Sequence, residues 1–436
     1  MNVIRQALAV LVMVLCGIST PARADEAETR MVLDTWMRLT LELVRHTPTY
    51  TPPVASRSLA YIGVTAFEVS AQDQPGLHSL AGQLNGLTAV PSAPPGVALD
   101  PALVLHVALR DVVAHLFANT GPTGQRAIQT VDAQLRDRLS AGLTGTVVQD
   151  SQAQGTAVAA HILQWAAQDG GDVIEMLGFP ADYVLTAGPA QWVPTGLVRL
   201  QQTPLLPDWG RNRPFAMPRG TACPLPPPPA YSEAPGSPFH AEAQEVVDIT
   251  AALTPEQTAI ARFWADDAML SMTPPGHWIA IAMQIFDRDD LPVADRAEVL
   301  ARLGIALADA FIGCWDAKFA YNLLRPVTYI RRVIDPGWQP LLLTPPFPEY
   351  PSGHSVQSAA AALVLTDYFG EDFAFDDASR TEDGLPLRSF PSFRAAAAEA
   401  AESRIYGGIH FRSAIDQGLA QGRCIGAYAA ALVTRS

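Results

Sequence analysis

The chain has 436 residues, of which 29 are lysine or arginine and 43 are aspartate or glutamate, so its formal net charge is −14 at pH 7. This acidic balance argues against nucleic acid or an acidic membrane surface as a partner. A chain of this length can bury a large hydrophobic core, and we expect two or three structural units.

The first 24 residues have the pattern of an export signal. Arg5 provides a positive start, an apolar run follows at 7–18, and positions 22–24 read Ala-Arg-Ala, an A-x-A cleavage site. The apolar run is shorter than the roughly 20 residues that a membrane-spanning helix needs, and no later apolar run reaches that length either. We therefore predict a signal peptide at 1–24 and an exported mature chain, periplasmic or secreted, without a membrane span.

The N-terminal region, 25–176, is dominated by helical periodicity. Apolar residues recur at three- and four-residue spacing, and proline and glycine separate one periodic segment from the next. Nothing in these segments indicates chemistry. The predicted helices cover 26–46, 56–72, 101–118, 123–143 and 147–169.

A proline-rich segment, 177–238, follows. Its prolines, including the run Pro226–Pro229, exclude long helices. We expect an ordered wrap over the helices or a linker between two helical halves, with Trp209 and Phe215 as side chains that would pin a wrap onto the core. The alternative is a ligand for a proline-binding domain.

Helical patterns resume in the C-terminal region, 239–436, so the predicted fold class is all-α, with helical bundles on either side of the irregular segment. A proline-rich loop at 335–350 and an acidic loop at 370–386 interrupt these patterns. The predicted helices cover 241–253, 255–269, 277–286, 294–324, 352–369, 395–406 and 413–433.

Three cations of the C-terminal region have a spacing that indicates an anion site. Lys318 is the only lysine of the chain, and Arg325 follows seven residues later, before a proline. Seven residues are close to two helical turns, so both cations project from one helix face, about 10 Å apart along the axis. Arg404 adds a third cation farther along the chain. Guanidinium groups offer paired donors to oxyanions, and a lysine adds a compact charge.

A glycine turn and two histidines complete the pattern. Ser352 suits the N-cap of the following helix, whose free N–H groups attract anions, and Gly353 lets an oxyanion approach the backbone closely. His354 is placed to act as a general acid or base. His410 follows a glycine pair and would offer an imidazole nitrogen to the central atom of the anion. Together with the cations, these residues predict a site for a tetrahedral oxyanion.

This order of residues resembles the superfamily shared by vanadium-dependent haloperoxidases and type 2 phosphatidic acid phosphatases, whose pattern is K-x6-RP, PSGH and SR-x5-H. Every named element is present from Lys318 to His410, and the resemblance covers roughly 254–422. Trp315 and Phe347 match pocket residues of the fungal chloroperoxidases. Asp266 looks like the acidic residue that pairs with the site arginines in those enzymes.

The sequence departs from the family pattern at one position. Many members have an acidic residue four positions after the last histidine, and here that position is Ala414. In the phosphatases this carboxylate orients the histidine. Asp416 is the nearest substitute, and a backbone carbonyl could hold the ring instead.

The resemblance implies one site with two chemistries. In a haloperoxidase the cofactor is vanadate: His410 would be the protein ligand to vanadium, Lys318 would polarise peroxide, His354 would assist proton transfer, and hydrogen peroxide would oxidise a halide. In a phosphatase, phosphate takes the place of vanadate: His410 would attack phosphorus and His354 would protonate the leaving group of a phosphate ester. Arg325, Arg404 and Lys318 would neutralise the oxygens in either case.

Our leading hypothesis is an exported vanadate-dependent haloperoxidase that acts on small molecules. Trp315, Phe347, Asp266 and the missing carboxylate at 414 favour it over the runner-up, a soluble acid phosphatase. A non-catalytic oxyanion-binding protein is the third alternative. Cys223, Cys314 and Cys424 allow one disulfide in an oxidising compartment. Phe347 hints at chloride by resemblance alone; halide, organic substrate and oligomeric state are not defined by the sequence.

Overall fold

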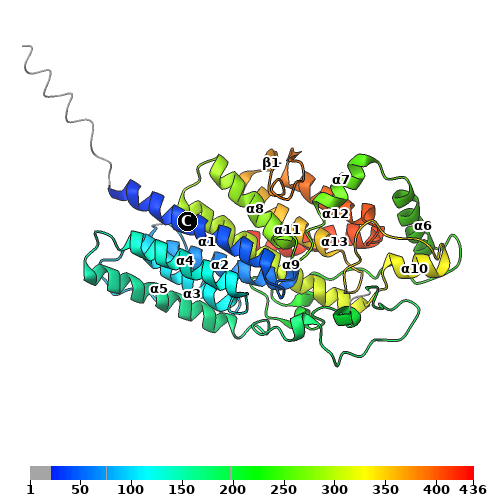
Figure 1. Cartoon of the computed structure of the whole chain (residues 1–436), viewed down its shortest axis with the longest axis horizontal. Helices are drawn as coiled ribbons and strands as arrows, with labels where there is room; N and C mark the ends of the chain where they lie inside the picture. Colours follow the sequence, from blue (N-terminus) through cyan, green and yellow to red (C-terminus); the bar gives the residue numbers. More distant parts are fainter. Residues whose placement is uncertain (1–20, 75, 197–198) are drawn as a thin grey trace, which may run out of the picture.

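The computed structural model describes residues 21–74, 76–196 and 199–436 and has an elongated shape (Figure 1). Residues 1–20 of the predicted signal peptide lie outside the described residues, and the first helix begins at Pro21. The predicted all-α class is confirmed, since helices account for nearly all regular structure in the described ranges. No helix among these residues combines the length and the apolar character that crossing a membrane requires.

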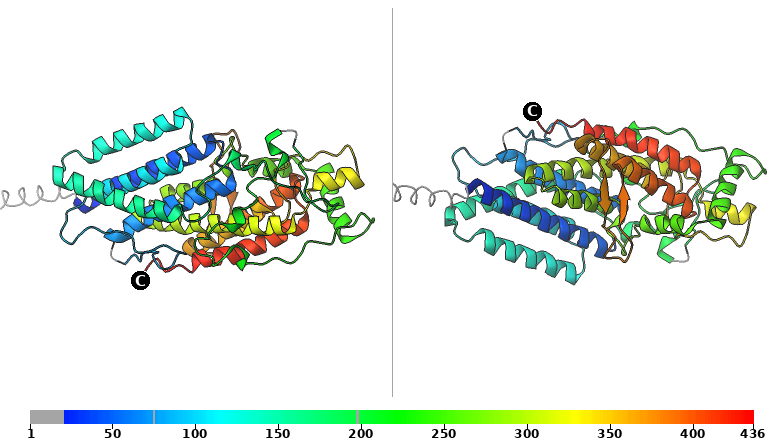
Figure 2. Two further views of the ribbon diagram at one scale, coloured as in Figure 1. Left: turned by 90° about the horizontal axis from the view of Figure 1, so that it is seen from below. Right: turned by 90° about the horizontal axis from the view of Figure 1, so that it is seen from above.

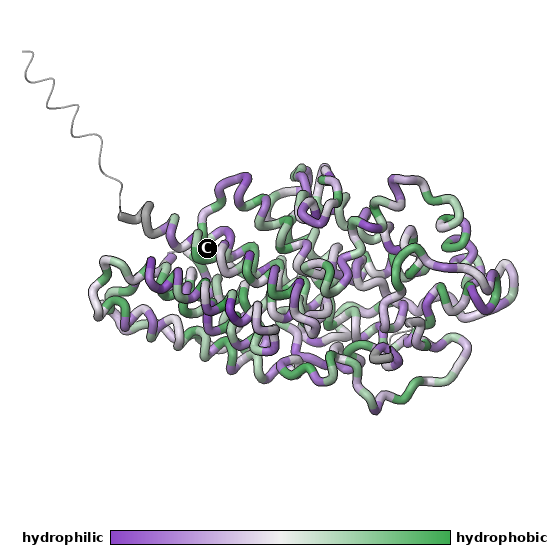
Figure 3. The backbone as a smooth tube through the Cα atoms, viewed as in Figure 1, coloured by the Kyte–Doolittle hydropathy of each residue, from purple (hydrophilic) through white to green (hydrophobic). Residues whose placement is uncertain are grey.

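The N-terminal helices form one end of the molecule (Figure 1). Prolines occupy the first turns of several of them, where the missing N–H costs nothing, and Asp100 caps one by accepting a hydrogen bond from Leu103 N. Hydrophobic and hydrophilic residues alternate along the outer helices, as expected for helices with one buried face (Figure 3). The helices are α1 (Pro21–His46), α2 (Pro52–Asp73), α3 (Pro101–Leu116), α4 (Pro122–Leu139) and α5 (Gly145–Ala166).

In its described residues, the proline-rich segment has short 3₁₀ turns as its only helical structure before α6, and part of it packs against the core. Trp209 and Phe215, the two residues expected to pin it, are 4% and 2% exposed. Buried Asp309 accepts hydrogen bonds from the backbone N–H groups of Phe215, Ala216 and Met217 at 2.6–2.9 Å, which holds the segment on the long helix that carries this aspartate. The turns are η1 (Met176–Gly178), η2 (Arg199–Gln202), η3 (Trp209–Arg211) and η4 (Gly220–Ala222).

The C-terminal half adds eight described helices and a two-stranded sheet. The sheet pairs Phe375 with Phe390 in antiparallel register; its first strand lies in the loop predicted at 370–386, and its second strand follows that loop. Its strands are three residues long, too short for a periodic signal. The helices are α6 (Pro238–Ala251), α7 (Pro255–Phe263), α8 (Thr273–Arg288), α9 (Val293–Tyr321), α10 (Pro326–Val333), α11 (Gly353–Phe369), α12 (Phe393–Tyr406) and α13 (Arg412–Ala430); the strands are β1 (Phe375–Asp377) and β2 (Arg388–Phe390).

Helix α9 is buried along almost its whole length and runs through the middle of the molecule, where it contacts both halves (Figure 2). Glycines permit the closest approaches. A Cβ at Gly63 of α2 would lie 2.6 Å from Leu300 O of α9, and one at Gly422 of α13 would lie 2.1 Å from Val356 O of α11. One continuous hydrophobic cluster therefore extends from the N-terminal helices to α13.

A disulfide joins Cys223, at the end of η4, to Cys424 of α13, and Cys314 of α9 is a buried free thiol. The disulfide closes a loop of 201 residues and ties the proline-rich segment to the last helix. The one disulfide that the sequence allowed is therefore present, and the structure assigns its partners.

Candidate active site

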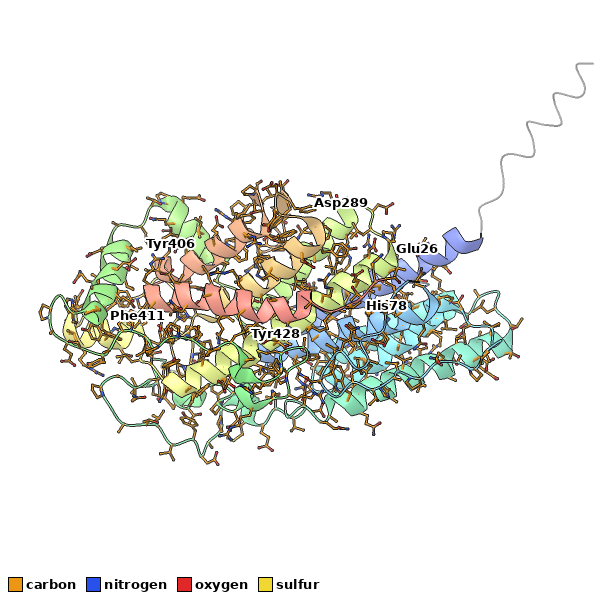
Figure 4. All side chains as sticks on the ribbon, turned by 180° about the vertical axis from the view of Figure 1, so that it is seen from behind. Glu26, His78, Asp289, Tyr406, Phe411 and Tyr428 are labelled. Carbon is orange, nitrogen blue, oxygen red and sulfur yellow. A yellow bond between two sulfur atoms is a disulfide. The ribbon has the colours of Figure 1, made fainter. Side chains whose placement is uncertain are left out.

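The predicted oxyanion residues meet at one end of the C-terminal bundle. This end carries Tyr406 and Phe411 in Figure 4, opposite Glu26. Lys318 lies in the last turn of α9, Arg325 precedes α10, and Arg404 lies in the last turn of α12. The remaining predicted residues lie in the turn that enters α11, at 352–354, and in the connection between α12 and α13, at 410. Several loops and helix ends thus converge on one point.

Lys318 is fully buried beneath this point. Its ammonium group donates hydrogen bonds to the carbonyl oxygens of Pro348 and Glu349, both at 2.9 Å, and to that of Pro351. Burial lowers the pKa of Lys318 to about 7. Because three carbonyl groups take its three protons, Lys318 in this conformation contributes charge and fixes the 348–351 turn.

Aromatic rings form the wall beside the lysine. The rings of Trp315 and Phe347 are 4.8 Å apart, and the Lys318 ammonium lies 5.3 Å from the Phe347 centroid. The indole N–H of Trp315 donates to Leu205 O at 3.2 Å, so the proline-rich segment orients this ring. The wall is apolar on the side that faces the cations.

Arg325 and His410 are in direct contact. The Nη1 group of Arg325 lies 3.1 Å from His410 Nε2 and also donates to Ile409 O at 2.9 Å. A guanidinium group can only donate, so Nε2 of His410 is the acceptor and Nδ1 carries the ring proton. Burial, together with the charges of Arg325 and Lys318, holds the pKa of His410 well below its usual range, so the ring is neutral. Burial likewise lowers the pKa of Arg325 to about 10.

Glu349 is the residue of this site that the sequence did not reveal. Its Oε1 accepts hydrogen bonds from His410 Nδ1 and from the backbone N–H of Phe411, both at 2.8 Å. The side chain is fully buried, and burial raises its pKa to about 8 against the opposing charge of Arg325. The expected substitute, Asp416, is exposed on α13. The available signal was a carboxylate two residues before the PSGH turn, in the proline-rich loop at 335–350.

His354 and Arg404 form the opposite side of the site. Arg404 Nη1 lies 2.9 Å from His354 Nε2 and donates to Trp264 O at 2.6 Å. Burial and the charge of Arg404 hold the pKa of His354 well below its usual range, and burial lowers the pKa of Arg404 to about 10. Ser352 caps α11 by accepting from Ser355 N at 3.3 Å.

The arrangement fits an oxyanion. Among the described residues, Arg325 Nη2 and Arg404 Nε are buried donors without a hydrogen-bond partner, and leaving such a group unpaired costs about 1–3 kcal/mol. A Cβ at Gly353 would meet nothing nearer than 3.9 Å, so packing within the protein does not require glycine there. The absence of a side chain at this position leaves room for an anion beside the N-terminus of α11. The three buried cations outnumber Glu349, the carboxylate that contacts His410. An anion with several acceptor oxygens, such as vanadate or phosphate, satisfies these donors.

Asp266 has a different partner from the one expected. Its carboxylate pairs with His277 Nδ1 at 2.9 Å and with Arg380, and it has no hydrogen bond to Arg325 or Arg404 among the described contacts. His277 Nε2 reaches Asp377 of β1 at 2.8 Å. Arg380, 114 residues away in sequence, takes this carboxylate. The charge of Asp266 still opposes the burial that lowers the pKa of Arg404, so its pairing with the site arginines stays a prediction.

This ion-pair network lies directly behind the site. Burial by itself would lower the pKa of His277, but the charges of Asp266 and Asp377 outweigh it and raise that pKa to about 10. The Trp264 ring stacks on His277 at 4.7 Å, and its backbone carbonyl accepts from Arg404. The sequence assigned His277 a structural role, and in the structure it is a buried, fully paired cation.

Comparisons with known proteins show which family this chain is similar to. The model of the VCPO second helical-bundle domain matches residues 298–436. The crystal structure of a bacterial vanadium-dependent iodoperoxidase is similar with a TM-score of 0.84 and 38% identity, over 92% of this chain and 95% of that one. The fold and the sequence together indicate the class of helical-bundle proteins to which vanadium-dependent peroxidases belong. The chain belongs to the vanadium-dependent haloperoxidase family.

Further matches have lower sequence identity. The holo and apo structures of a bacterial vanadium-dependent chloroperoxidase share the fold at TM-scores of 0.69 and 0.66 with 18% and 17% identity, covering 90% and 88% of this chain and 93% and 94% of theirs. The vanadium chloroperoxidase of Curvularia inaequalis is 29% identical over 141 residues, which are 27% of this chain and 23% of that protein. The chain thus matches about a quarter of that curated relative.

Proposed function

We propose that this protein is a vanadate-dependent haloperoxidase that oxidises a halide, with iodide preferred, at the expense of hydrogen peroxide. The observation that carries the proposal is the pair of buried, unpartnered donors on Arg325 and Arg404 beside His410, whose Nε2 lies 3.1 Å from Arg325 Nη1. Membership of the vanadium haloperoxidase family supports vanadate as the cofactor. The 38% identity to an iodoperoxidase supports iodide.

Each residue of the site has a role that follows from its contacts. His410 would hold vanadium through Nε2, and Arg325 and Arg404 would hold the surrounding oxygens together with the N–H of Gly353. Bound vanadate supplies the activation of hydrogen peroxide toward halide. His354 is neutral and touches Arg404, so it is suited to move a proton at an oxygen of the anion. The positive charge of Lys318, beneath the site, raises the attraction for the anion.

The experiment is a reconstitution. Vanadate-free protein is titrated with orthovanadate, and oxidation of iodide, bromide and chloride by hydrogen peroxide is followed separately. We expect activity that depends on vanadate and is highest with iodide. His410→Ala, which removes the proposed vanadium ligand, is the matched control and should stay inactive. Oxyanion binding without oxidation of any halide would contradict the proposal.

A second candidate function, phosphate-ester hydrolysis, is favoured by one specific contact. The missing carboxylate at 414 argued against a nucleophilic histidine, but Glu349 supplies a carboxylate at 2.8 Å from His410 Nδ1. A histidine oriented in this way can attack phosphorus while Arg325 and Arg404 stabilise the equatorial oxygens. Incubation with a labelled phosphate ester tests this function: a phosphoenzyme that is absent in His410→Ala supports it. A protein that binds oxyanions but catalyses neither reaction would be the third alternative.

We further propose that the chain is exported to the periplasm or beyond. The apolar N-terminal segment with its A-x-A site supports export, and so does the Cys223–Cys424 disulfide, because such bonds persist in oxidising compartments. Expression with and without residues 1–24, followed by fractionation, tests the proposal. Retention of the full-length chain in the cytoplasm would contradict it.

A further inference from the structure

We propose that Glu349 is the positioning residue for His410, and that it sets which ring nitrogen faces the bound oxyanion. This inference rests on the proposed oxyanion site and adds a residue that neither the motif nor the comparisons assign. Glu349 is not expected to touch the anion. It acts through the imidazole, by accepting the Nδ1 proton and keeping the lone pair on Nε2, where Arg325 Nη1 donates in this structure and where the central atom of the anion would bind.

The contacts of Glu349 hold its backbone and its carboxylate in position. The backbone N–H of Glu349 donates to Leu323 O at 3.0 Å, and its carbonyl accepts from the Lys318 ammonium at 2.9 Å. Its Oε1 is also held by the backbone N–H of Phe411, the residue after His410. The carboxylate is thus fixed from its own backbone and from the backbone next to the ring. A fully buried carboxylate whose Oε1 is held by a backbone N–H can orient a ring by a single hydrogen bond, although its Oε2 has no partner among the described residues.

The two nitrogens of His410 have opposite environments. Nδ1 faces Glu349 Oε1, an oxygen that already accepts from the Phe411 N–H, and Nε2 faces a guanidinium group, which can only donate. Both contacts demand the same tautomer, with the proton on Nδ1. Without Glu349, the Arg325 contact alone would define the tautomer, and the ring would lose the bond that fixes its plane.

Charge and positioning make opposite predictions for substitutions at 349. If Glu349 mattered only through its negative charge, removing that charge would tighten oxyanion binding, because Lys318, Arg325 and Arg404 would be less compensated. If Glu349 positions the ring, Glu349→Gln keeps an acceptor for Nδ1 and retains binding, whereas Glu349→Ala loses the acceptor and weakens it. The sign of the change therefore identifies the role.

The test measures binding rather than turnover. Vanadate-free wild type, E349Q and E349A are titrated calorimetrically with orthovanadate and with inorganic phosphate. We expect the dissociation constant of E349Q to stay within about threefold of wild type, and that of E349A to rise by about 10–100-fold. Asp416→Asn, which changes the exposed carboxylate first considered for this role, should bind like wild type. Equal or tighter binding by E349A overturns the proposal.

A measurement on the unmodified protein makes the proposal independent of whether a variant folds. Nitrogen NMR of ring-labelled histidine, with His410 assigned by difference from His410→Ala, should show the proton on Nδ1 before vanadate is added. A proton on Nε2 in wild type overturns the proposal. Should E349A fail to fold, the binding experiment uses Glu349→Met instead, because methionine fills a similar volume without offering an acceptor to Nδ1. If wild type binds neither anion, the proposed function fails instead, which is a distinct result.

Discussion

Two buried clusters of charged residues lie side by side in the C-terminal half, and they differ in how completely their charges are paired. In the network of Asp266, His277, Asp377 and Arg380, every charge has a partner of opposite sign, and His277 is held as a cation between two carboxylates. In the oxyanion site the cations outnumber the carboxylate, and donors on two arginines are unpaired among the described residues. Paired charges indicate a structural role, and unpaired buried cations indicate a missing anion.

The largest expected effect comes from breaking the paired network. His277→Ala would leave Asp266 and Asp377 buried without the charge between them, and removing one partner of a buried ion pair costs about 3–5 kcal/mol. Chemical denaturation of the vanadate-free protein measures this loss. A loss below about 1 kcal/mol would show that the network is not the structural cluster inferred here.

The matching change in the site should act on ligand binding instead. His410→Ala removes the proposed vanadium ligand, and we expect vanadate affinity to fall by at least about a hundredfold. Its effect on stability should be smaller than that of His277→Ala, because His410 is neutral, Glu349 Oε1 keeps the Phe411 N–H, and Arg325 Nη1 keeps Ile409 O. Denaturation and vanadate titration of both variants compare the clusters directly. Equal effects on stability would erase the distinction.

Anion binding should raise the free energy of unfolding, and this gain should depend on residues of the oxyanion site. Orthovanadate or phosphate at a hundred times its dissociation constant should raise the free energy of unfolding of wild type by about 2.7 kcal/mol. Arg404→Met, which removes one unpaired donor, should reduce this gain. Asp376→Asn, on the exposed face of β1, is a control that should keep the full gain. Sulfate-free buffers are needed because sulfate would compete.

The last effect, and the most specific one, concerns pH. The pKa of His277 is raised from 6.5 to about 10 in the folded protein, so its contribution to stability is complete below pH 6.5 and is lost as the pH rises through about 10. The pKa of Asp266 is lowered from 3.8 to about 2: burial alone would raise it, but the charge of His277 dominates. That contribution is present above pH 3.8 and is lost as the pH falls through about 2. Stability relative to His277→Ala, measured from pH 4 to 10, should therefore decline at the alkaline end.

The sequence predicted the local parts of both the fold and the site. Helical periodicity and proline breaks were sufficient for the all-α class, although α7 ends at Phe263 rather than 269 and α10 was not predicted. Lys318, Arg325, His354, Arg404 and His410 were singled out by residue type and spacing, and the structure places them together. Their catalytic roles remain predictions.

What the sequence could not provide were partners chosen by tertiary contact. Asp266 pairs with Arg380, because β1 and the turn after it bring position 380 next to a residue 114 positions earlier. Glu349 reaches His410 across 61 positions, while the family pattern directed attention to position 414. In each case the type of side chain was informative, but the identity of its partner depended on packing between distant segments.

The burial of Lys318 has a practical consequence for chemical labelling. Because Lys318 is the only lysine of these 436 residues and is fully buried, no lysine side chain of this sequence is open to amine-reactive reagents in the folded protein. Labelling under native conditions should therefore leave Lys318 and the oxyanion site unmodified. Partial unfolding would expose this amine, so modification of Lys318 reports directly on the opening of this end of the molecule.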